Sequence, residues 1–140
     1  MKTPAANLTI DDIRARLEPL FHDSGLQLVV LFGSLAKGLR RKDSDIDLAF
    51  LYDGPFNELL LTNRVSQLLH SDAIDVVDLH TASPLLKYAA MQHGQALFER
   101  SPGTFITYYT LAFRRYVDTK KLRDAQRSVV RNYLAGRERP

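Results

Sequence analysis

The chain has 140 residues, of which 45% are hydrophobic and 25% charged, with no cysteine and a formal net charge of +3. This length suits one domain with a core that needs no covalent staples, and the lack of cysteine excludes disulfides and thiolate metal sites. No apolar run approaches the roughly 20 residues that span a bilayer, and the N-terminus lacks the apolar core of a signal peptide, so we expect a cytoplasmic protein without a membrane role.

Hydrophobic periodicity and turn residues divide the chain into helices and strands. In chain order we expect a helix over 7–22, strands over 26–32 and 45–52, a helix over 56–70, a strand over 73–79, a helix over 83–94, a short strand over 95–99 and a long helix over 104–134. Strands alternating with helices predict an α/β (α+β) fold in which helices flank a small mixed sheet. We expect the chemistry where strand ends meet, because such sheets place their ligands there.

Signals at helix ends support these boundaries. Thr9 and Asp12 have the spacing of a capping box at the start of the first helix, and Pro19 should bend or end that helix within its last turn. Ser83 and Pro84 are typical of an N-cap and a first helical turn.

Charge is unevenly distributed between the two ends of the chain. From Gly103 onward there are nine Lys and Arg against three Asp and Glu, whereas the preceding part has ten against thirteen. We divide the chain into a core, residues 1–102, and a basic helical extension, residues 103–140, packed on the core or on a partner. A solvated helix face explains the basic residues more simply than nucleic-acid binding does.

Aromatic residues recur along the long helix. Tyr108, Tyr109 and Tyr116 are most simply explained as core and interface residues. Together with Phe105, Phe113 and Leu122 they could also form an apolar strip for a partner, but we expect packing on the sheet first.

The stretch from Gly33 to Asp47 is the most informative part of the sequence. Gly33 and Ser34 follow a predicted buried strand and open a predicted helix start, where backbone amides attract phosphate. Asp45 and Asp47 are two apart on a strand, so their side chains share one face. Two such carboxylates repel each other unless a cation lies between them, and hard oxygen ligands suit Mg²⁺.

Basic residues in the connecting segment add a third feature, since they could neutralise a triphosphate. These residues are Lys37, Arg40, Arg41 and Lys42. A Gly-Ser turn, an Asp-x-Asp pair or a basic loop is usually structural when it occurs alone. In this order, between two strands, the three together indicate chemistry on a nucleotide.

The same stretch resembles a known family. Gly-Ser, ten residues and then Asp-x-Asp is similar to the signature of the nucleotidyltransferase superfamily that includes DNA polymerase beta. The fuller pattern Gly-Ser-x-Ala-Lys-Gly followed by Ser-Asp-Ile-Asp-Leu resembles the minimal nucleotidyltransferase (MNT) antitoxins, as do residues 74–79 and 82–84 downstream. The similarity covers roughly residues 26–98.

The resemblance implies a function. MNT antitoxins are commonly encoded beside a HEPN-domain ribonuclease toxin, and characterised members transfer AMP to a tyrosine of that toxin. We therefore expect an Mg²⁺-dependent nucleotidyltransferase that uses ATP and has a HEPN toxin as its partner. The alternatives are an antitoxin that acts by binding alone, a transferase acting on a small-molecule hydroxyl, and, more weakly, a basic nucleic-acid binder.

The expected metal site consists of carboxylates. Asp45 and Asp47 are predicted to hold one or two Mg²⁺ ions, and a third carboxylate completes the site. Asp75 and Asp78 are the candidates, and because they are three apart on one strand they point to opposite faces. We favour Asp75, whose setting is similar to that of the third acid of the family, and which could also act as the base on the attacking hydroxyl.

The expected nucleotide contacts lie in the loop before this site. Gly33 and Ser34 should contact the triphosphate, Lys37 should bind a phosphate, and Ser44 should orient Asp45 or cap the turn. Many relatives have Arg in place of Lys37, and Lys binds phosphate as a point charge without the bidentate fork. We expect that difference to alter nucleotide affinity and not the chemistry.

One motif is set aside. Arg64 and His70 have the Arg-x₅-His spacing of the HEPN nuclease motif, but Asp72 stands where a Tyr would complete it. We interpret this spacing as chance.

Overall fold

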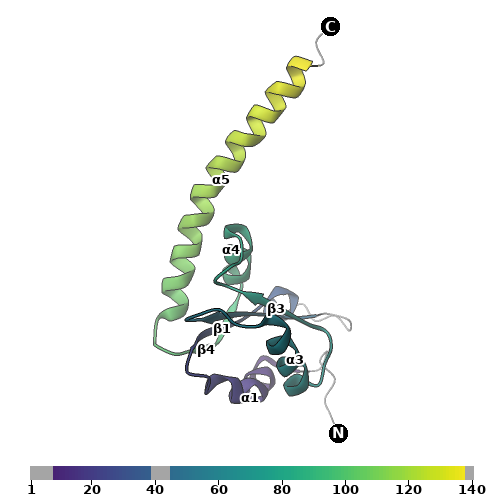
Figure 1. Ribbon diagram of the computed structural model, residues 1–140, viewed down its shortest axis with the longest axis vertical. Helices are drawn as coiled ribbons and strands as arrows, with labels where there is room; N and C mark the ends of the chain where they lie inside the picture. Colours follow the sequence, from purple (N-terminus) through teal and green to yellow (C-terminus); the bar gives the residue numbers. More distant parts are fainter. Residues whose placement is uncertain (1–7, 39–44, 138–140) are drawn as a thin grey trace.

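A computed structural model describes residues 8–38 and 45–137 (Figure 1). Its elements are α1 (Ile10–Phe21), β1 (Leu26–Phe32), α2 (Gly33–Ala36), β2 (Ile46–Tyr52), α3 (Glu58–Leu69), β3 (Ile74–Asp78), α4 (Pro84–Gln92), β4 (Gln95–Glu99) and α5 (Thr104–Arg137). The predicted order of helices and strands is confirmed. The last helix continues past its predicted end and through Gly136, because one helical glycine costs only about 1 kcal/mol and does not by itself end a helix.

The four strands form one mixed sheet in the order β3-β2-β1-β4. β2 and β3 are parallel, whereas β1 is antiparallel to both of its neighbours, β2 and β4. Helices flank both faces: α1 and α3 lie on one side, and α4 and the start of α5 on the other (Figure 1). The predicted fold class is therefore confirmed.

Alternation along the strands separates two cores. In β1, Val29 and Leu31 belong to the core beneath α1 and α3, whereas Leu28 and Val30 belong to the core beneath α4 and α5. Successive side chains of a strand point to opposite faces, so one strand supplies both cores. In β2 the same rule places Ala49, and with it every second residue, on the side of α4 and α5.

Both predicted helix starts are confirmed. Thr9 and Asp12 form a reciprocal capping box at the start of α1, and Ser83 accepts a hydrogen bond from the backbone of Leu86 at the start of α4. Pro19 lies inside α1, which ends two residues later at Phe21. Because these signals act between neighbours in sequence, they could be recognised without the tertiary structure.

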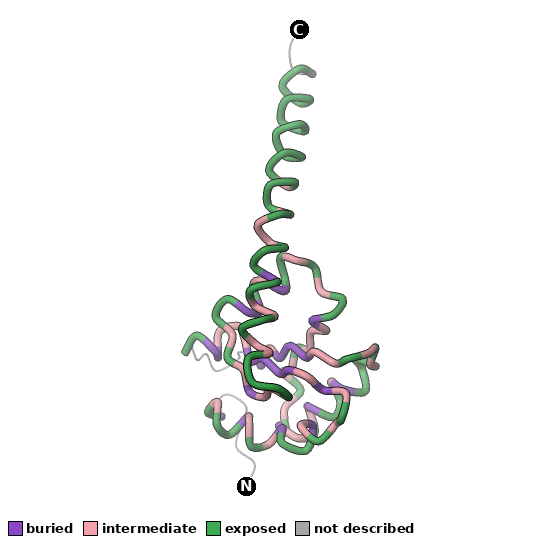
Figure 2. The backbone as a smooth tube through the Cα atoms, turned by 90° about the vertical axis from the view of Figure 1, so that its left-hand side faces the viewer, coloured by how far each residue is buried: buried purple, intermediate pink, exposed green. Residues whose placement is uncertain are grey.

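The long helix α5 has two different halves. Its first turns pack on the molecule: Ala112 is buried, and the Tyr108 hydroxyl donates a 2.6 Å hydrogen bond to the carbonyl oxygen of Leu79. The Tyr109 and Tyr116 rings contact Tyr88 of α4, so all three tyrosines pack within the chain, and their role at an interface stays a prediction. Farther along, α5 extends beyond the sheet and α4, and its residues from Lys120 to Gly136 are exposed except for the half-buried Arg123 (Figure 2). Within the part of the chain that the structure describes, no helix has both the length and the apolar character to cross a membrane.

Candidate active site

Asp47 is at the centre of the candidate site. The strand register pairs it with Phe32 of β1 on one side and with Asp75 of parallel β3 on the other. Alternation from Ala49 and Val77, which belong to the core beneath α4 and α5, places Asp47 and Asp75 on that same side of the sheet. Asp47 is half-buried, whereas Asp45 and Asp75 are exposed.

Gly33 lies directly against the Asp47 carboxylate. Its φ of +77° belongs to the left-handed region that glycine tolerates, and a Cβ at this position would overlap the Asp47 carboxylate oxygen. Gly33 also begins α2, where the N-cap residue Phe32 makes no side-chain capping bond. The Gly-Ser step therefore positions a helix start beside a carboxylate, and no larger residue could replace its glycine without displacing Asp47.

Burial and nearby negative charges disfavour the ionised form of Asp47. Burial, followed by the charges of Asp75 and Asp45, raises the pKa of Asp47 from 3.8 to about 6. The ion pairs that the described residues form involve other acids: Asp11, Glu18 and Asp23. A carboxylate whose charged form is destabilised by two neighbouring acids would be stabilised by a bound cation.

This donor set fits Mg²⁺ in part. Within residues 8–38 and 45–137, no three acidic or histidine side chains converge closely enough to form a complete metal cage. Mg²⁺ usually keeps several waters and takes one or two protein carboxylates together with substrate phosphates, so a complete cage is not required. Asp45, Asp47 and Asp75 supply hard oxygen donors of the kind that such a shared ion needs.

Asp78 has a different role from Asp75. It lies three residues after Asp75, at the end of β3, and its charge acts on Lys87 of α4 and on Tyr108 of α5. Its carboxylate accepts a 2.8 Å hydrogen bond from the backbone N–H of His80 and thus caps the turn after the strand. Burial and then Arg115 lower the pKa of Lys87, while the charge of Asp78 opposes this shift. The register thus supports Asp75 as the third carboxylate.

The remaining predicted nucleotide contacts are placed less fully. Ser34 is half-buried in the first turn of α2, and Lys37 follows that helix as its exposed C-cap. Ser44, with Arg40, Arg41 and Lys42, lies outside the described residues. Contact of these side chains with a triphosphate stays a prediction.

Sequence reasoning missed Gln95, which hydrogen-bonds to the end of α2 beside the site. Gln95, the first residue of β4, donates a 3.1 Å hydrogen bond from its side-chain amide to the carbonyl oxygen of Ala36, at the end of α2. Gly94 before it is closely packed, because a Cβ there would overlap the Ala90 carbonyl oxygen. No local signal marks Gln95, since it reaches α2 only through the pairing of β4 with β1.

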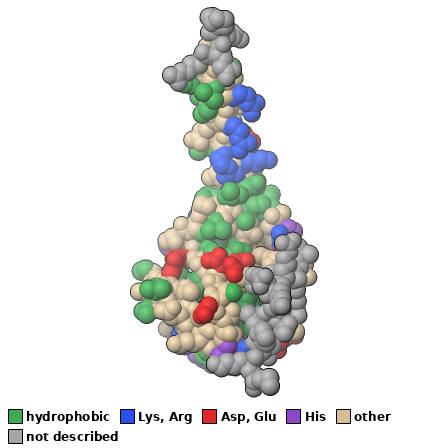
Figure 3. All heavy atoms as spheres, turned by 90° about the vertical axis from the view of Figure 1, so that its right-hand side faces the viewer, with side chains coloured by type: hydrophobic (Ala, Val, Ile, Leu, Met, Phe, Trp, Pro, Cys, Tyr) green, Lys and Arg blue, Asp and Glu red, His purple; other side chains and the backbone are tan. Residues whose placement is uncertain are grey.

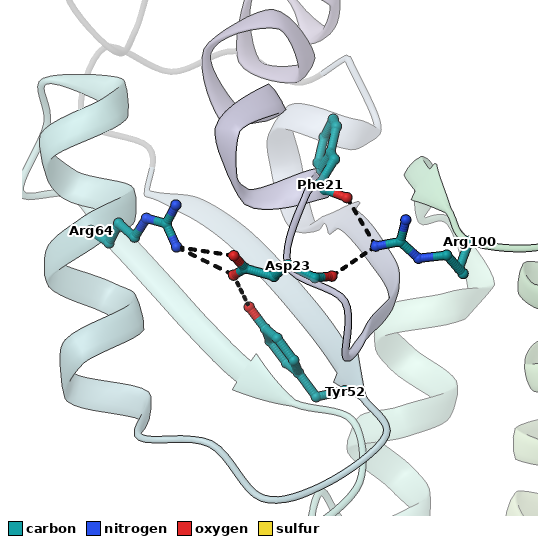
Figure 4. A network of polar contacts seen from close by, with 5 residues as sticks. All are labelled: Phe21, Asp23, Tyr52, Arg64 and Arg100. Atoms are coloured by element: carbon teal, nitrogen blue, oxygen red, sulfur yellow. Dashed lines mark hydrogen bonds and ion pairs between the residues drawn. The ribbon is translucent and has the colours of Figure 1, made fainter.

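A second polar cluster lies at the other end of β2 (Figure 4). Asp23 accepts hydrogen bonds from Arg64 at 3.2 and 3.4 Å and from the Tyr52 hydroxyl at 3.3 Å. Arg100 donates to the carbonyl oxygens of Phe21 and Asp23 at 2.9 and 2.7 Å. Burial, and then Asp23, raise the pKa of Tyr52 to about 12, so this hydroxyl stays protonated. Arg64 therefore has a structural partner, which agrees with the interpretation of its spacing to His70 as chance.

On one face of the molecule, three kinds of surface follow one another from the body toward the end of α5 (Figure 3). Acidic side chains gather on the body, hydrophobic side chains lie between them and α5, and Lys and Arg side chains line the projecting part of α5. This arrangement brings a negatively charged region and a basic helix onto the same side.

Comparison with known proteins adds independent findings. The family model described as "Polymerase beta, Nucleotidyltransferase" matches residues 16–103. The protein adenylyltransferase MntA of Aphanizomenon flos-aquae is 26% identical over 121 residues, which cover 78% of this chain and 81% of that protein. MntA of Shewanella oneidensis is 36% identical over 76 residues, or 52% of this chain and 54% of the relative. A crystal structure of a toxin–antitoxin with AMP-PNP is similar with a TM-score of 0.73 and 27% identity, covering 88% of this chain and 98% of the matched one.

Proposed function

This chain belongs to the polymerase beta nucleotidyltransferase family, and from that premise we propose that it is an antitoxin that transfers AMP from ATP to a tyrosine of a HEPN-domain toxin. The observation that carries the proposal is the register of β2 and β3, which sets Asp47 opposite Asp75 while Gly33 lies against the Asp47 carboxylate. This geometry joins the two parts of the Gly-Ser and Asp-x-Asp pattern into one site.

The relatives support the finer parts of the proposal. Two similar proteins are named protein adenylyltransferases, and a similar structure is that of a toxin–antitoxin with AMP-PNP. These are properties of those proteins. They favour ATP as the donor and a protein as the acceptor for this chain, in agreement with the resemblance to MNT antitoxins.

The proposed reaction is an in-line displacement at the α-phosphorus of ATP. The tyrosine oxygen forms a bond to that phosphorus, the bond to the α,β-bridging oxygen breaks, and pyrophosphate leaves with the bonding electron pair. Asp75, opposite Asp47 in the register and exposed, accepts the proton of the tyrosine hydroxyl. Asp45, Asp47 and Asp75 would hold Mg²⁺, which supplies charge stabilisation to the phosphates.

The loop before the site would bind the triphosphate. Gly33 and Ser34 present backbone amides and a hydroxyl at the start of α2, and Lys37 supplies a positive charge one turn later. Ser44 is proposed to orient Asp45. Gln95 holds the end of α2 and is a positioning residue.

The proposed domain division follows the start of α5. The core comprises residues 1–102, and the extension comprises residues 103–140. Gly103, with a φ of +89°, forms the turn into α5, and the first turns of the helix pack on the core. The first half of the extension would therefore pack on the core, and its second half would bind a partner.

Neutralisation by binding alone is the second candidate. The observation that favours it is the projecting half of α5, which offers a binding surface that catalysis does not require. Under this alternative, replacement of the carboxylates would leave the neutralisation of the toxin intact.

The deciding experiment is incubation with labelled ATP, Mg²⁺ and the product of the neighbouring gene, which this proposal expects to be a HEPN protein, followed by intact-mass analysis of both chains. We expect a gain of AMP on the partner that is lost in Asp45→Asn/Asp47→Asn and kept in the matched control Asp78→Asn. Tight complex formation without AMP on either chain would favour neutralisation by binding. Transfer to a small-molecule hydroxyl, and not to the partner, would favour the third alternative.

A further inference from the structure

The projecting half of α5 is exposed and lies beyond the sheet and α4 in the described part of the chain. From Lys120 to Leu134 every residue is exposed except Arg123, which is half-buried (Figures 1 and 2). Large apolar side chains share this exposure, with exposed fractions of 58% for Leu122, 67% for Val129, 56% for Val130 and 50% for Leu134. Exposed apolar side chains at this density, beside charged ones, are typical of a protein-binding surface.

One stripe of α5 is aromatic where it contacts α4 and basic where α5 projects beyond α4. Along the first half, Tyr109, Phe113 and Tyr116 contact the Tyr88 ring of α4, with ring centroids 6.3, 5.8 and 4.4 Å apart. Helical spacing continues this stripe one turn further into a basic stripe. The basic stripe consists of Lys120, Arg123, Arg127 and Arg131. Arg123 joins the two parts, since its guanidinium lies over the Tyr116 ring at 5.2 Å.

Apolar residues interrupt the basic stripe at regular intervals. Val130 lies three residues after Arg127, and Leu134 three after Arg131, so each shares the face of these arginines. Between residues 117 and 137 there are six basic side chains against two acidic ones, of which Asp124 lies at the edge of the stripe. The surface is thus positively charged with an apolar component.

The stripe lies on the same side as the candidate active site. Its aromatic continuation faces α4, and α4 covers the face of the sheet to which Asp47 and Asp75 belong. Figure 3 shows Lys and Arg side chains on α5 above the face where acidic side chains gather. A partner lying along this face would therefore contact the helix and reach the carboxylates.

We propose that the basic stripe of α5 docks an acidic protein surface that also has apolar residues, and that this surface belongs to the acceptor protein. The inference rests on the proposed function, because that function supplies the acceptor. A second copy of this chain is disfavoured as the occupant, since it would bring a basic stripe against another. RNA is disfavoured because Val130 and Leu134 have nothing to contact on a phosphate backbone. Charge complementarity of this kind steers a partner and sets its orientation.

The test is charge reversal with a matched control. Arg127→Glu/Arg131→Glu reverses two charges of the stripe, and Arg114→Glu/Lys121→Glu reverses two exposed charges elsewhere on the same helix. Glu is a good helix former, and circular dichroism verifies that α5 persists. Binding of the HEPN protein that the proposed function requires is measured by titration calorimetry, and AMP transfer is measured as a function of its concentration.

We expect the stripe variant to bind the HEPN protein at least about tenfold more weakly, with its KM raised similarly and kcat within about twofold. The control should behave as wild type, and wild-type affinity should fall more steeply with NaCl than that of the stripe variant. Unchanged affinity in the stripe variant would overturn the proposal. Loss of RNA-oligonucleotide binding with intact partner binding would overturn it too, in favour of a nucleic-acid surface. If wild type binds the partner but transfers no AMP, while the stripe variant weakens the complex, the docking surface stands and the proposed function fails.

Discussion

The two ends of β2 place carboxylates in opposite electrostatic settings. At its start, Asp47 faces Asp75, with Asp45 nearby, and its pKa is raised to about 6. At its end, Asp23 forms an ion pair with Arg64 and accepts a hydrogen bond from the Tyr52 hydroxyl (Figure 4). A carboxylate paired with hydrogen-bond donors stabilises the fold, whereas one close to other carboxylates lowers the free energy of unfolding unless a cation is bound. The same residue type thus marks a structural cluster at one end of the strand and the candidate active site at the other.

The largest expected effect is the loss of AMP transfer when the carboxylate at the start of β2 is replaced, compared with the one at its end. Asp47→Asn should lower AMP transfer to the partner by roughly 10³-fold or more, because it removes a charge that the metal and the phosphates need. Asp23→Asn should retain activity within about threefold, since its carboxylate only joins structural elements. Steady-state transfer assays on both variants check this. Comparable losses in the two would show that the ends of β2 do not differ in function.

Gly33 tests how closely the active end is packed. Gly33→Ala places a methyl group where the Asp47 carboxylate lies, at a φ of +77°. We expect transfer to fall by about 10²-fold and the free energy of unfolding to fall by about 1–3 kcal/mol. Gly54→Ala is the control, because a Cβ at Gly54 meets nothing within 4 Å. Urea unfolding together with the transfer assay measures both effects, and a fully active, stable Gly33→Ala would contradict the packing described.

Removing the structural carboxylate should affect stability alone. Asp23→Asn weakens the bonds from Arg64 and Tyr52, and we expect the free energy of unfolding to fall by about 1.5 kcal/mol. Asp72→Asn, at an exposed acid, should change it by less than about 0.5 kcal/mol. Urea unfolding of both variants, of Arg64→Gln and of Arg64→Gln/Asp23→Asn checks this. If the double variant lost the sum of the Asp23→Asn and Arg64→Gln effects, the Arg64–Asp23 ion pair would contribute nothing.

The smallest expected effect is a dependence on pH in the absence of metal. Because the folded-state pKa of Asp47 is about 6 and its ordinary value is 3.8, the folded protein binds more protons between these values. The stability of wild type should therefore fall relative to Asp47→Asn as pH rises from about 4 to 6, by about 1 kcal/mol after allowing for solvent screening. Urea unfolding with EDTA at several pH values measures this. Added Mg²⁺ should diminish the difference at pH 7, and a difference that stays flat from pH 4 to 7 would contradict it.

Much of the fold could be predicted because its signals are local. The capping box of Thr9 and Asp12, the N-cap at Ser83 and the apolar run of β1 each depend on residues close in sequence. The candidate site could be proposed for the same reason, since Gly33, Asp45 and Asp47 belong to one short pattern. Asp75 was favoured over Asp78 from the resemblance, and the register of β3 against β2 agrees with that choice.

The sequence by itself determined the order of elements, the positions of the strands and the residues around which the carboxylate site is built. Only the tertiary structure decided that Asp47 faces Asp75, that Gln95 braces α2, and that Asp23 gathers Arg64, Tyr52 and Arg100 at the other end of the sheet. It also decided where α5 stops packing. The physical reason is range: caps, alternation and helical spacing act between neighbours, whereas strand register and helix placement depend on cores assembled from the whole chain.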